Sequence, residues 1–181
     1  MKAILSQMGV EVLTQAEVGV YLEREETGTT FEENSLLKAR AVMEASGLPA
    51  IADDSGLCVD ALGGAPGVYS ARYGGPGLDD VGRYCLLLEN MKGQPRGAKF
   101  VSVITCCFPH GDVLTARGEC PSTIAVAPMG EGGFGYDPVF FIPSLKKTFA
   151  QLTPEEKNAI SHRGKALEAF QVKLREYLEK S

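Results

Sequence analysis

The stretch Ala50–Tyr73, AIADDSGLCVDALGGAPGVYSARY, decides how the rest of the chain is interpreted. It begins with a short apolar run, Ala50–Ala52, which predicts a buried strand. That run ends at two adjacent carboxylates, Asp53 and Asp54. Gly63–Gly67 then provides a backbone that can turn sharply and approach a ligand closely.

Two interpretations of these acids remain open. Carboxylates where a strand runs into a glycine-bearing loop suit Mg²⁺, which takes oxygen ligands and often carries the phosphates of a substrate. A capped turn explains the same residues, because Asp and Ser both favour turns. Alternation along a strand places Asp53 and Asp54 on opposite sides, so one of them is expected to serve the site and the other the scaffold.

Composition limits the class of protein. The 181 residues are 44% hydrophobic and contain no run of membrane-spanning length, so a soluble globular protein is expected. The chain opens without a basic-then-apolar leader, which favours a cytoplasmic location. Five cysteines without a Cys-x-x-Cys pair indicate reduced thiols rather than a zinc site.

Charge points to a small ligand. The net charge of −5 argues against a nucleic-acid partner. Residues 146–175 nevertheless carry seven basic side chains against three acidic ones. Such a segment attracts a small polyanion, although a solvated helix face accounts for part of it.

Periodicity and turn residues predict an α/β protein. The expected helices are Met1–Met8, Thr30–Ser46, Asp79–Asn90 and two near the C-terminus, of which the first begins with a capping box at Thr153. The expected strands are Val10–Leu13, Ala50–Ala52, Leu57–Leu62, a hairpin of Lys99–Pro109 with Asp112–Val126, and Val139–Ile142.

The helix at Thr30–Ser46 carries polar residues at its start. Thr30 and Glu33 have the capping-box spacing, in which each side chain bonds the backbone N–H of the other residue. Glu33 and Lys38 lie within about a turn and a half of each other on a helix. Because a capping glutamate beside a positive helix end needs no metal, the cap is the simpler explanation of Glu33.

A second glycine-dense loop, Gly130–Pro138, precedes the strand at Val139. Its glycines admit a flat ligand, on which Phe134 or Tyr136 can stack, and Asp137 can accept hydrogen bonds from a base edge. A bent loop that merely enters the strand explains the same residues. Further along, His162 and Arg163 near a helix start are a possible anion site.

Four longer segments carry a resemblance: TFEENSLLKAR, IADDSGLCVDALGGAPGVYSARYGG, GGFGYDPVFF and LTPEEKNAISHRGKAL. In this order they resemble the inosine/xanthosine triphosphate pyrophosphatases, which hydrolyse non-canonical purine nucleoside triphosphates. The resemblance implies an elongated α/β fold, with a long mixed twisted sheet flanked by helices, two lobes in one domain with a cleft, and a homodimer.

The resemblance also implies chemistry, namely Mg²⁺-dependent cleavage between the α and β phosphates of a purine nucleoside triphosphate. Asp54 resembles the general base and a metal ligand, and Glu33 a second metal ligand. The implied substrate-binding residues are Lys38, Ser55, Phe134, Gly135, Tyr136, Asp137, Lys157, His162 and Arg163.

One departure from the family is expected to matter. The family opens with a strand and a Ser/Thr-x-Asn-x-x-Lys phosphate loop, and this sequence begins within the helix that follows them. A nucleotide-binding protein with little turnover is therefore an alternative to an active enzyme. A purely structural domain of the same fold is a third possibility, against which the site motifs argue.

Overall fold

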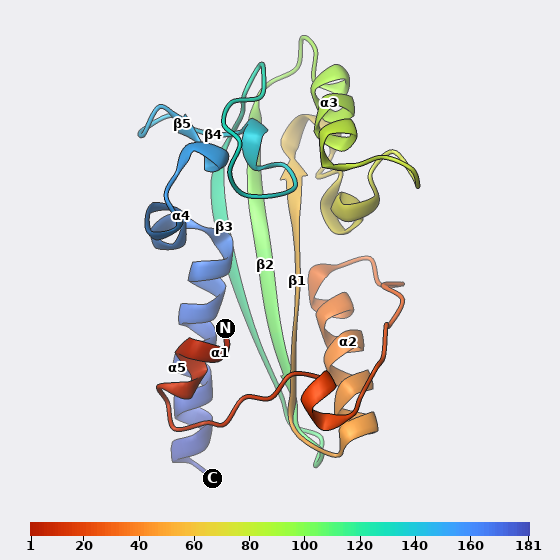
Figure 1. Ribbon diagram of the computed structural model, residues 1–181, viewed down its shortest axis with the longest axis vertical. Coiled ribbons are helices and arrows are strands. Elements are labelled where there is room, and N and C mark those ends of the chain that lie inside the picture. The colour runs from red at the N-terminus through yellow and green to blue at the C-terminus, as the bar shows by residue number, and fades with distance from the viewer. The chain divides into compact units, whose positions relative to one another are not determined.

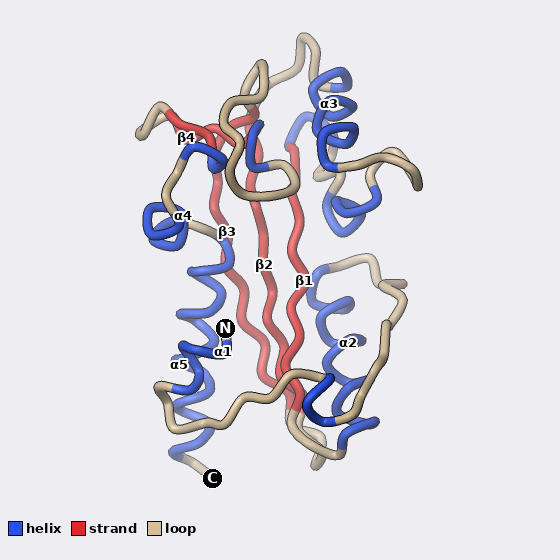
Figure 2. The backbone as a smooth tube through the Cα atoms, in the orientation of Figure 1, coloured by secondary structure: helices blue, strands red, loops and turns tan.

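The computed structural model describes residues 1–181 and shows an α/β protein built on a five-stranded sheet (Figures 1 and 2). The strands follow one another across the sheet in chain order. They are β1 (Ala50–Val59), β2 (Gly97–Cys107), β3 (Val113–Ile124), β4 (Phe140–Ile142) and β5 (Lys147–Thr148). The α/β class and the expected long hairpin, which corresponds to β2 and β3, are therefore confirmed.

Five α-helices accompany the sheet. They are α1 (Lys2–Ser6), α2 (Phe31–Ser46), α3 (Asp80–Asn90), α4 (Pro154–Ile160) and α5 (His162–Glu179). The capping box predicted for α4 is present, because Thr153 and Glu156 exchange both side-chain-to-backbone hydrogen bonds. No helix is long and apolar enough to span a membrane.

The chain divides into two compact units, each with its own hydrophobic core. The first unit comprises Met1–Asp54, Ser102–Gly118 and Arg163–Ser181, and the second comprises Ser55–Val101 and Glu119–His162. Every residue of one core cluster belongs to the first unit, and every residue of the other belongs to the second. Each core can therefore be explained from its own unit.

Both faces of the sheet are covered in the first unit. Ile104 and Cys106 of β2 share a buried cluster with Phe170 of α5. The hydroxyl of Thr105 points the other way and lies 2.6 Å from the hydroxyl of Ser35 in α2. Because successive strand residues face opposite sides, α5 and α2 cover opposite faces here (Figure 1). This double coverage explains why residues 102–108 are buried without interruption.

Burial also determines the chemistry of the cysteines in this unit. Burial, with a smaller contribution from the neighbouring Cys107, raises the pKa of the Cys106 thiol to about 12. Burial likewise raises the pKa of Cys107. These thiols stay protonated at neutral pH and pack as small hydrophobic groups.

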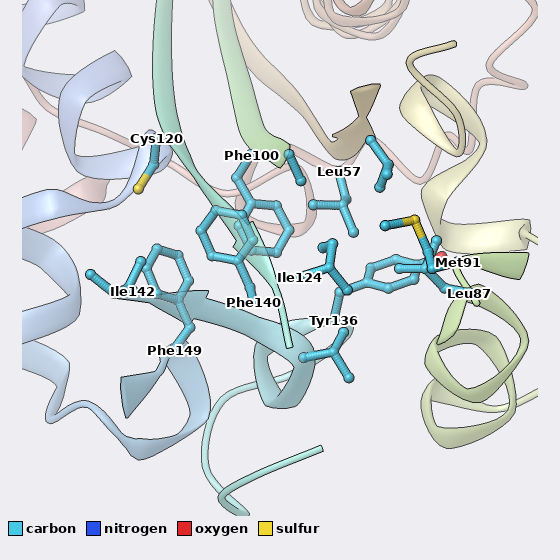
Figure 3. Close-up of a cluster of buried hydrophobic side chains, with 13 residues drawn as sticks. Leu57, Leu87, Met91, Phe100, Cys120, Ile124, Tyr136, Phe140, Ile142 and Phe149 are labelled. Atoms are coloured by element: carbon cyan, nitrogen blue, oxygen red, sulfur yellow. The ribbon is translucent and has the colours of Figure 1, made fainter. Parts of the chain in front are cut away.

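Aromatic rings form the centre of the second core. Phe100 of β2 lies 4.3 Å from Phe140 of β4 and 5.5 Å from Phe149, measured between ring centroids (Figure 3). The ring of Phe149 meets that of Phe140 edge-on at 4.8 Å. Leu87 of α3 and Met91, the residue that follows this helix, are both fully buried and belong to the same cluster.

The strand predicted at Val10–Leu13 does not form, and this segment has no regular secondary structure. A strand needs a neighbour to receive its backbone hydrogen bonds, and the sheet ends at β1. Val10–Leu13 instead lines a cavity of about 1020 Å³, together with residues 48–53 and Lys38. All residues lining this cavity belong to the first unit.

The sheet also differs from the mixed sheet that the resemblance implies. Strands adjacent in the chain are adjacent in the sheet, and β4 pairs antiparallel with both β3 and β5.

The strand at Ala50 continues further than the sequence predicts. The local sequence pattern predicts a turn at Asp53–Gly56 and a separate strand at Leu57–Leu62. Instead, β1 runs unbroken from Ala50 to Val59, and Asp60–Leu62 forms a short 3₁₀ helix. Pairing with β2 overrides the local turn preference of Asp, Ser and Gly.

We predict that Phe140→Ala destabilises the second unit by about 3–5 kcal/mol, because it opens a cavity between two packed rings. Denaturant unfolding followed by circular dichroism measures this loss. Val126 is 86% exposed in the same unit, so Val126→Ala is the control and should change stability by less than about 0.5 kcal/mol. Similar effects of the two substitutions would contradict this view of the core.

Candidate functional site

A buried carboxylate beside an ammonium group is the main chemical feature of the first unit. The side chain of Asp54 on β1 is only 7% exposed, and its Oδ1 lies 3.8 Å from Nζ of Lys38 on α2. The same Nζ lies 2.8 Å from Oε1 of Glu26. Lys38 therefore stands between two carboxylates, one fixed on the strand and one on the preceding loop.

Asp53 faces a different environment, as strand alternation predicts. Its side chain is 41% exposed, and its Oδ2 lies 4.0 Å from a guanidinium nitrogen of Arg163. Arg163 is itself 53% exposed at the start of α5. Of the two adjacent acids, Asp54 is the buried one that lies next to a lysine.

Glu33 caps α2, but not through the bond that the sequence predicts. Thr30 accepts a hydrogen bond from the Glu33 N–H at 3.1 Å, as expected. The Glu33 carboxylate, however, accepts from the N–H of Thr29 at 2.7 Å rather than from Thr30. The hydrogen bond from the Glu33 side chain thus goes to the backbone of Thr29, on the loop that also carries Glu26.

Asn34 holds the same loop and is not among the predicted site residues. Its side chain is fully buried, and Oδ1 accepts the N–H of Gly28 at 2.8 Å. A β-carbon at Gly28 would lie 2.7 Å from that oxygen, so only glycine allows this close approach. The sequence contains a signal for this contact in the glycine six residues before the asparagine.

In the second unit, the loop Gly130–Pro138 is organised around Asp137. Its side chain is 4% exposed, and Oδ2 accepts the N–H of Phe134 at 3.1 Å and meets Nζ of Lys157 at 2.5 Å. Gly133 has a positive φ of 69°, and a β-carbon there would collide with this carboxylate. The loop therefore needs both its glycine and its buried acid.

The structure distinguishes between the two aromatic residues of this loop. Phe134 is 57% exposed, and Nζ of Lys157 lies 4.6 Å from the centre of its ring. Tyr136 is 6% exposed, lies in the core cluster of Figure 3, and donates its hydroxyl to the carbonyl of Ser70 at 2.7 Å. Burial raises the pKa of Tyr136, so it remains a donor. Phe134 is therefore the ring available for stacking, and Tyr136 supports the loop.

Two further contacts complete the surroundings of this loop. Gly135 donates its N–H to Asp80 at the start of α3 at 3.0 Å. The imidazole of His162 is 6% exposed and stacks on Phe100 at 4.6 Å, with the two ring planes 16° apart. The rings of Phe100 and His162 thus form a buried stacked pair within the second unit. Asp80 and Phe100 are not among the predicted site residues.

The predicted site residues fall into two groups. In the first unit, the structure brings Lys38 and Asp54 together, and it places Glu33 on the same helix as Lys38 and Arg163 on α5 beside Asp53. In the second unit, Ser55 is half-buried on β1. His162, the first residue of α5, also belongs to the second unit. The loop Gly130–Pro138 there brings together five of the predicted residues: Phe134, Gly135, Tyr136, Asp137 and Lys157.

The acidic residues suit a magnesium ion shared with a ligand. Nowhere in the chain do three or more His, Cys, Asp or Glu side chains come together as a metal site. Mg²⁺ usually takes only one or two protein carboxylates and completes its shell with water and substrate phosphates. A single carboxylate such as Asp54 is a ligand of the kind that such an ion can use.

Comparison with known proteins gives consistent matches along the chain. The sequence profile of the Ham1 family matches residues 1–173. The dITP/XTP pyrophosphatase of Yersinia pestis is 49% identical over 178 residues, covering 96% of this chain and 90% of that protein. The enzyme of the same name from Thermus thermophilus is 50% identical over 172 residues, covering 94% and 83%.

Solved structures agree with the sequence matches. A HAM1 protein from Coxiella burnetii superposes with a TM-score of 0.91 at 43% identity, covering 97% of this chain and 91% of that one. The Ham1 protein of Staphylococcus aureus gives a TM-score of 0.82 at 44% identity, covering 86% and 82%.

We predict that Lys157→Met destabilises the second unit by on the order of 3 kcal/mol, because it leaves the buried Asp137 charge without its cation. Lys147→Met is the matched control, since Lys147 lies 3.9 Å from Glu156 in an exposed pair and its loss should cost less than about 1 kcal/mol. Denaturant midpoints of both variants test this difference. Equal midpoints would show that the Lys157–Asp137 pair does not stabilise the loop.

Proposed function

The chain belongs to the Ham1 family, and we propose that it hydrolyses non-canonical purine nucleoside triphosphates such as dITP and XTP. The products are the nucleoside monophosphate and pyrophosphate. The names of relatives about 50% identical over more than nine-tenths of the chain support this assignment. Hydrolysis of such nucleotides removes them from the pool of nucleic-acid precursors.

The observation that carries the proposal is the placement of Asp54. A buried carboxylate is costly unless it is paired, and a protein gains little stability by burying one. Here the acid lies on a strand beside Lys38, which also faces a large cavity. Asp54 does not itself line the cavity, but the cation beside it does, and a buried acid next to such a cation is typical of a reaction centre for an anionic substrate.

Asp54 would act as the general base. Its carboxylate accepts a proton from a water molecule, and the oxygen of that water forms a bond to the α-phosphorus. The bond between this phosphorus and the oxygen bridging to the β-phosphate breaks, and pyrophosphate leaves with the electron pair. Lys38 stabilises the negative charge that accumulates on the phosphate oxygens.

Asp54 and Glu33 are the residues that would hold the metal. When bound, Mg²⁺ neutralises charge on the phosphates and on the departing pyrophosphate. The Oε2 atom of Glu33 already accepts two hydrogen bonds from Thr29, so Oε1 is the atom that remains to face a cation. Ser55, which follows Asp54 directly, would contact the substrate.

The loop around Asp137 would receive the base. Phe134 offers an exposed ring for stacking, while Lys157 and Asp137 fix its position. Hypoxanthine and xanthine carry a 6-keto oxygen where adenine carries an amine. His162 or Arg163 would donate a hydrogen bond to that oxygen, and adenine would leave the donor unpaired.

Assembly and location are further parts of the proposal. We propose a homodimer that works in the cytoplasm without membrane or nucleic-acid partners. A cytoplasmic location gives such an enzyme access to free nucleotides, which are its substrates. The net charge of −5 disfavours binding to nucleic acid.

We predict pyrophosphate release from dITP and XTP that exceeds release from dATP by at least about a hundredfold in kcat/KM, because adenine leaves the donor to the 6-keto oxygen unpaired. Removal of Mg²⁺ with EDTA should abolish release, and added Mg²⁺ should restore it. A coupled phosphate assay measures both effects. Tight binding of inosine nucleotides without release would instead identify a nucleotide-binding protein with little turnover.

We predict that Asp54→Asn lowers kcat for dITP by about 10²–10⁴-fold, since the amide cannot accept the proton. Asp112→Asn is the control in the same unit, because Asp112 is 58% exposed at the β2–β3 turn. Steady-state kinetics of both variants provide the comparison. An Asp54→Asn enzyme within about threefold of the wild type would eliminate Asp54 as the base.

A further inference from the structure

Lys38 has one close counter-ion, and it is not the proposed catalytic acid. The distance from Nζ to Oε1 of Glu26 is 2.8 Å, whereas the distance to Oδ1 of Asp54 is 3.8 Å. The first distance is that of a charge-assisted hydrogen bond, and the second is too long for one. The position of the ammonium group is therefore determined mainly by Glu26.

Hydrogen bonds to α2 hold the loop that carries Glu26. Two residues later, Gly28 donates to the buried Asn34, and Thr29 donates to Glu33 at 2.7 Å. Both acceptors lie on the first turn of α2, which also carries Lys38 one turn further on. The loop and the helix thus form a closed arrangement in which Glu26 reaches Lys38.

This arrangement orders a side chain that is otherwise mobile. A lysine has a long flexible stem, and holding it in one geometry costs conformational entropy. Glu26 and Lys38 are 32% and 27% exposed, and both line the 1020 Å³ cavity, so the pair can be reached by a ligand. A lysine that is already ordered binds phosphate oxygens with less entropic loss.

We propose that Glu26 is a positioning residue that holds the Lys38 ammonium beside Asp54 for phosphate contact. This inference rests on the proposed pyrophosphatase function. In this proposal Glu26 acts through Lys38 and takes no part in the bonds that form and break. Neither the metal nor the base-binding loop is involved.

The kinetic test is a double-mutant cycle with dITP as substrate. Glu26→Gln should lower kcat/KM by about tenfold, because it replaces a charge-assisted hydrogen bond by a neutral one. Glu25→Gln is the matched control, since the neighbouring Glu25 is exposed and contributes a backbone carbonyl to Thr27. In a Lys38→Met background, Glu26→Gln should have no further effect. An equal tenfold loss in both backgrounds would overturn the proposal.

A second readout is independent of turnover. In protein labelled with ¹⁵N-lysine, the Nζ resonance of Lys38 is assigned by its loss in Lys38→Arg. We expect that resonance to be protected from solvent exchange in the wild type and in Glu25→Gln, and to broaden in Glu26→Gln. An unchanged resonance in Glu26→Gln would overturn the proposal. Broadening in a protein that releases no pyrophosphate would support the positioning role while refuting the proposed activity.

Discussion

The interaction on which the candidate reaction centre depends is the ion pairing of Lys38 with two carboxylates. The carboxylate of Asp54 is buried, and such a charge is tolerated only with a nearby cation. Lys38 supplies that cation, at 3.8 Å from Asp54 and 2.8 Å from Glu26. Without Lys38, the carboxylates of Asp54 and Glu26 would have no shared cation. The ammonium group therefore links β1, α2 and the loop before α2 electrostatically.

The second unit also pairs a buried carboxylate with a lysine, but here the acid lies on a loop rather than on a strand. Asp137 is buried within the loop, and Lys157 approaches it to 2.5 Å while also lying over the ring of Phe134. The aromatic core formed by Phe100 and Phe140 includes Tyr136 and so supports this loop (Figure 3). In both units, then, one lysine compensates a buried acid and stays accessible enough to meet a ligand.

Local signals in the sequence were more reliable than signals that depend on a neighbouring strand. The capping box at Thr153 is complete, whereas the box at Thr30 forms only one of its two bonds, because the Glu33 carboxylate accepts from Thr29 instead. The strand predicted at Val10–Leu13 fails because no other strand pairs with it, and the turn predicted at Asp53–Gly56 fails because β2 pairs through it. The burial of Tyr136 and the contact between Glu26 and Lys38 were not predictable, because both arise from tertiary packing.

The central claim is that Asp54 is buried for chemistry rather than for stability. The most direct measurement is the denaturant midpoint of Asp54→Asn beside that of the wild type. Because Lys38 keeps Glu26 as its partner and Asn matches Asp in shape, we predict an equal or higher midpoint. A clear fall in the midpoint would show that the carboxylate holds the fold together, and would contradict its assignment as the group retained for catalysis.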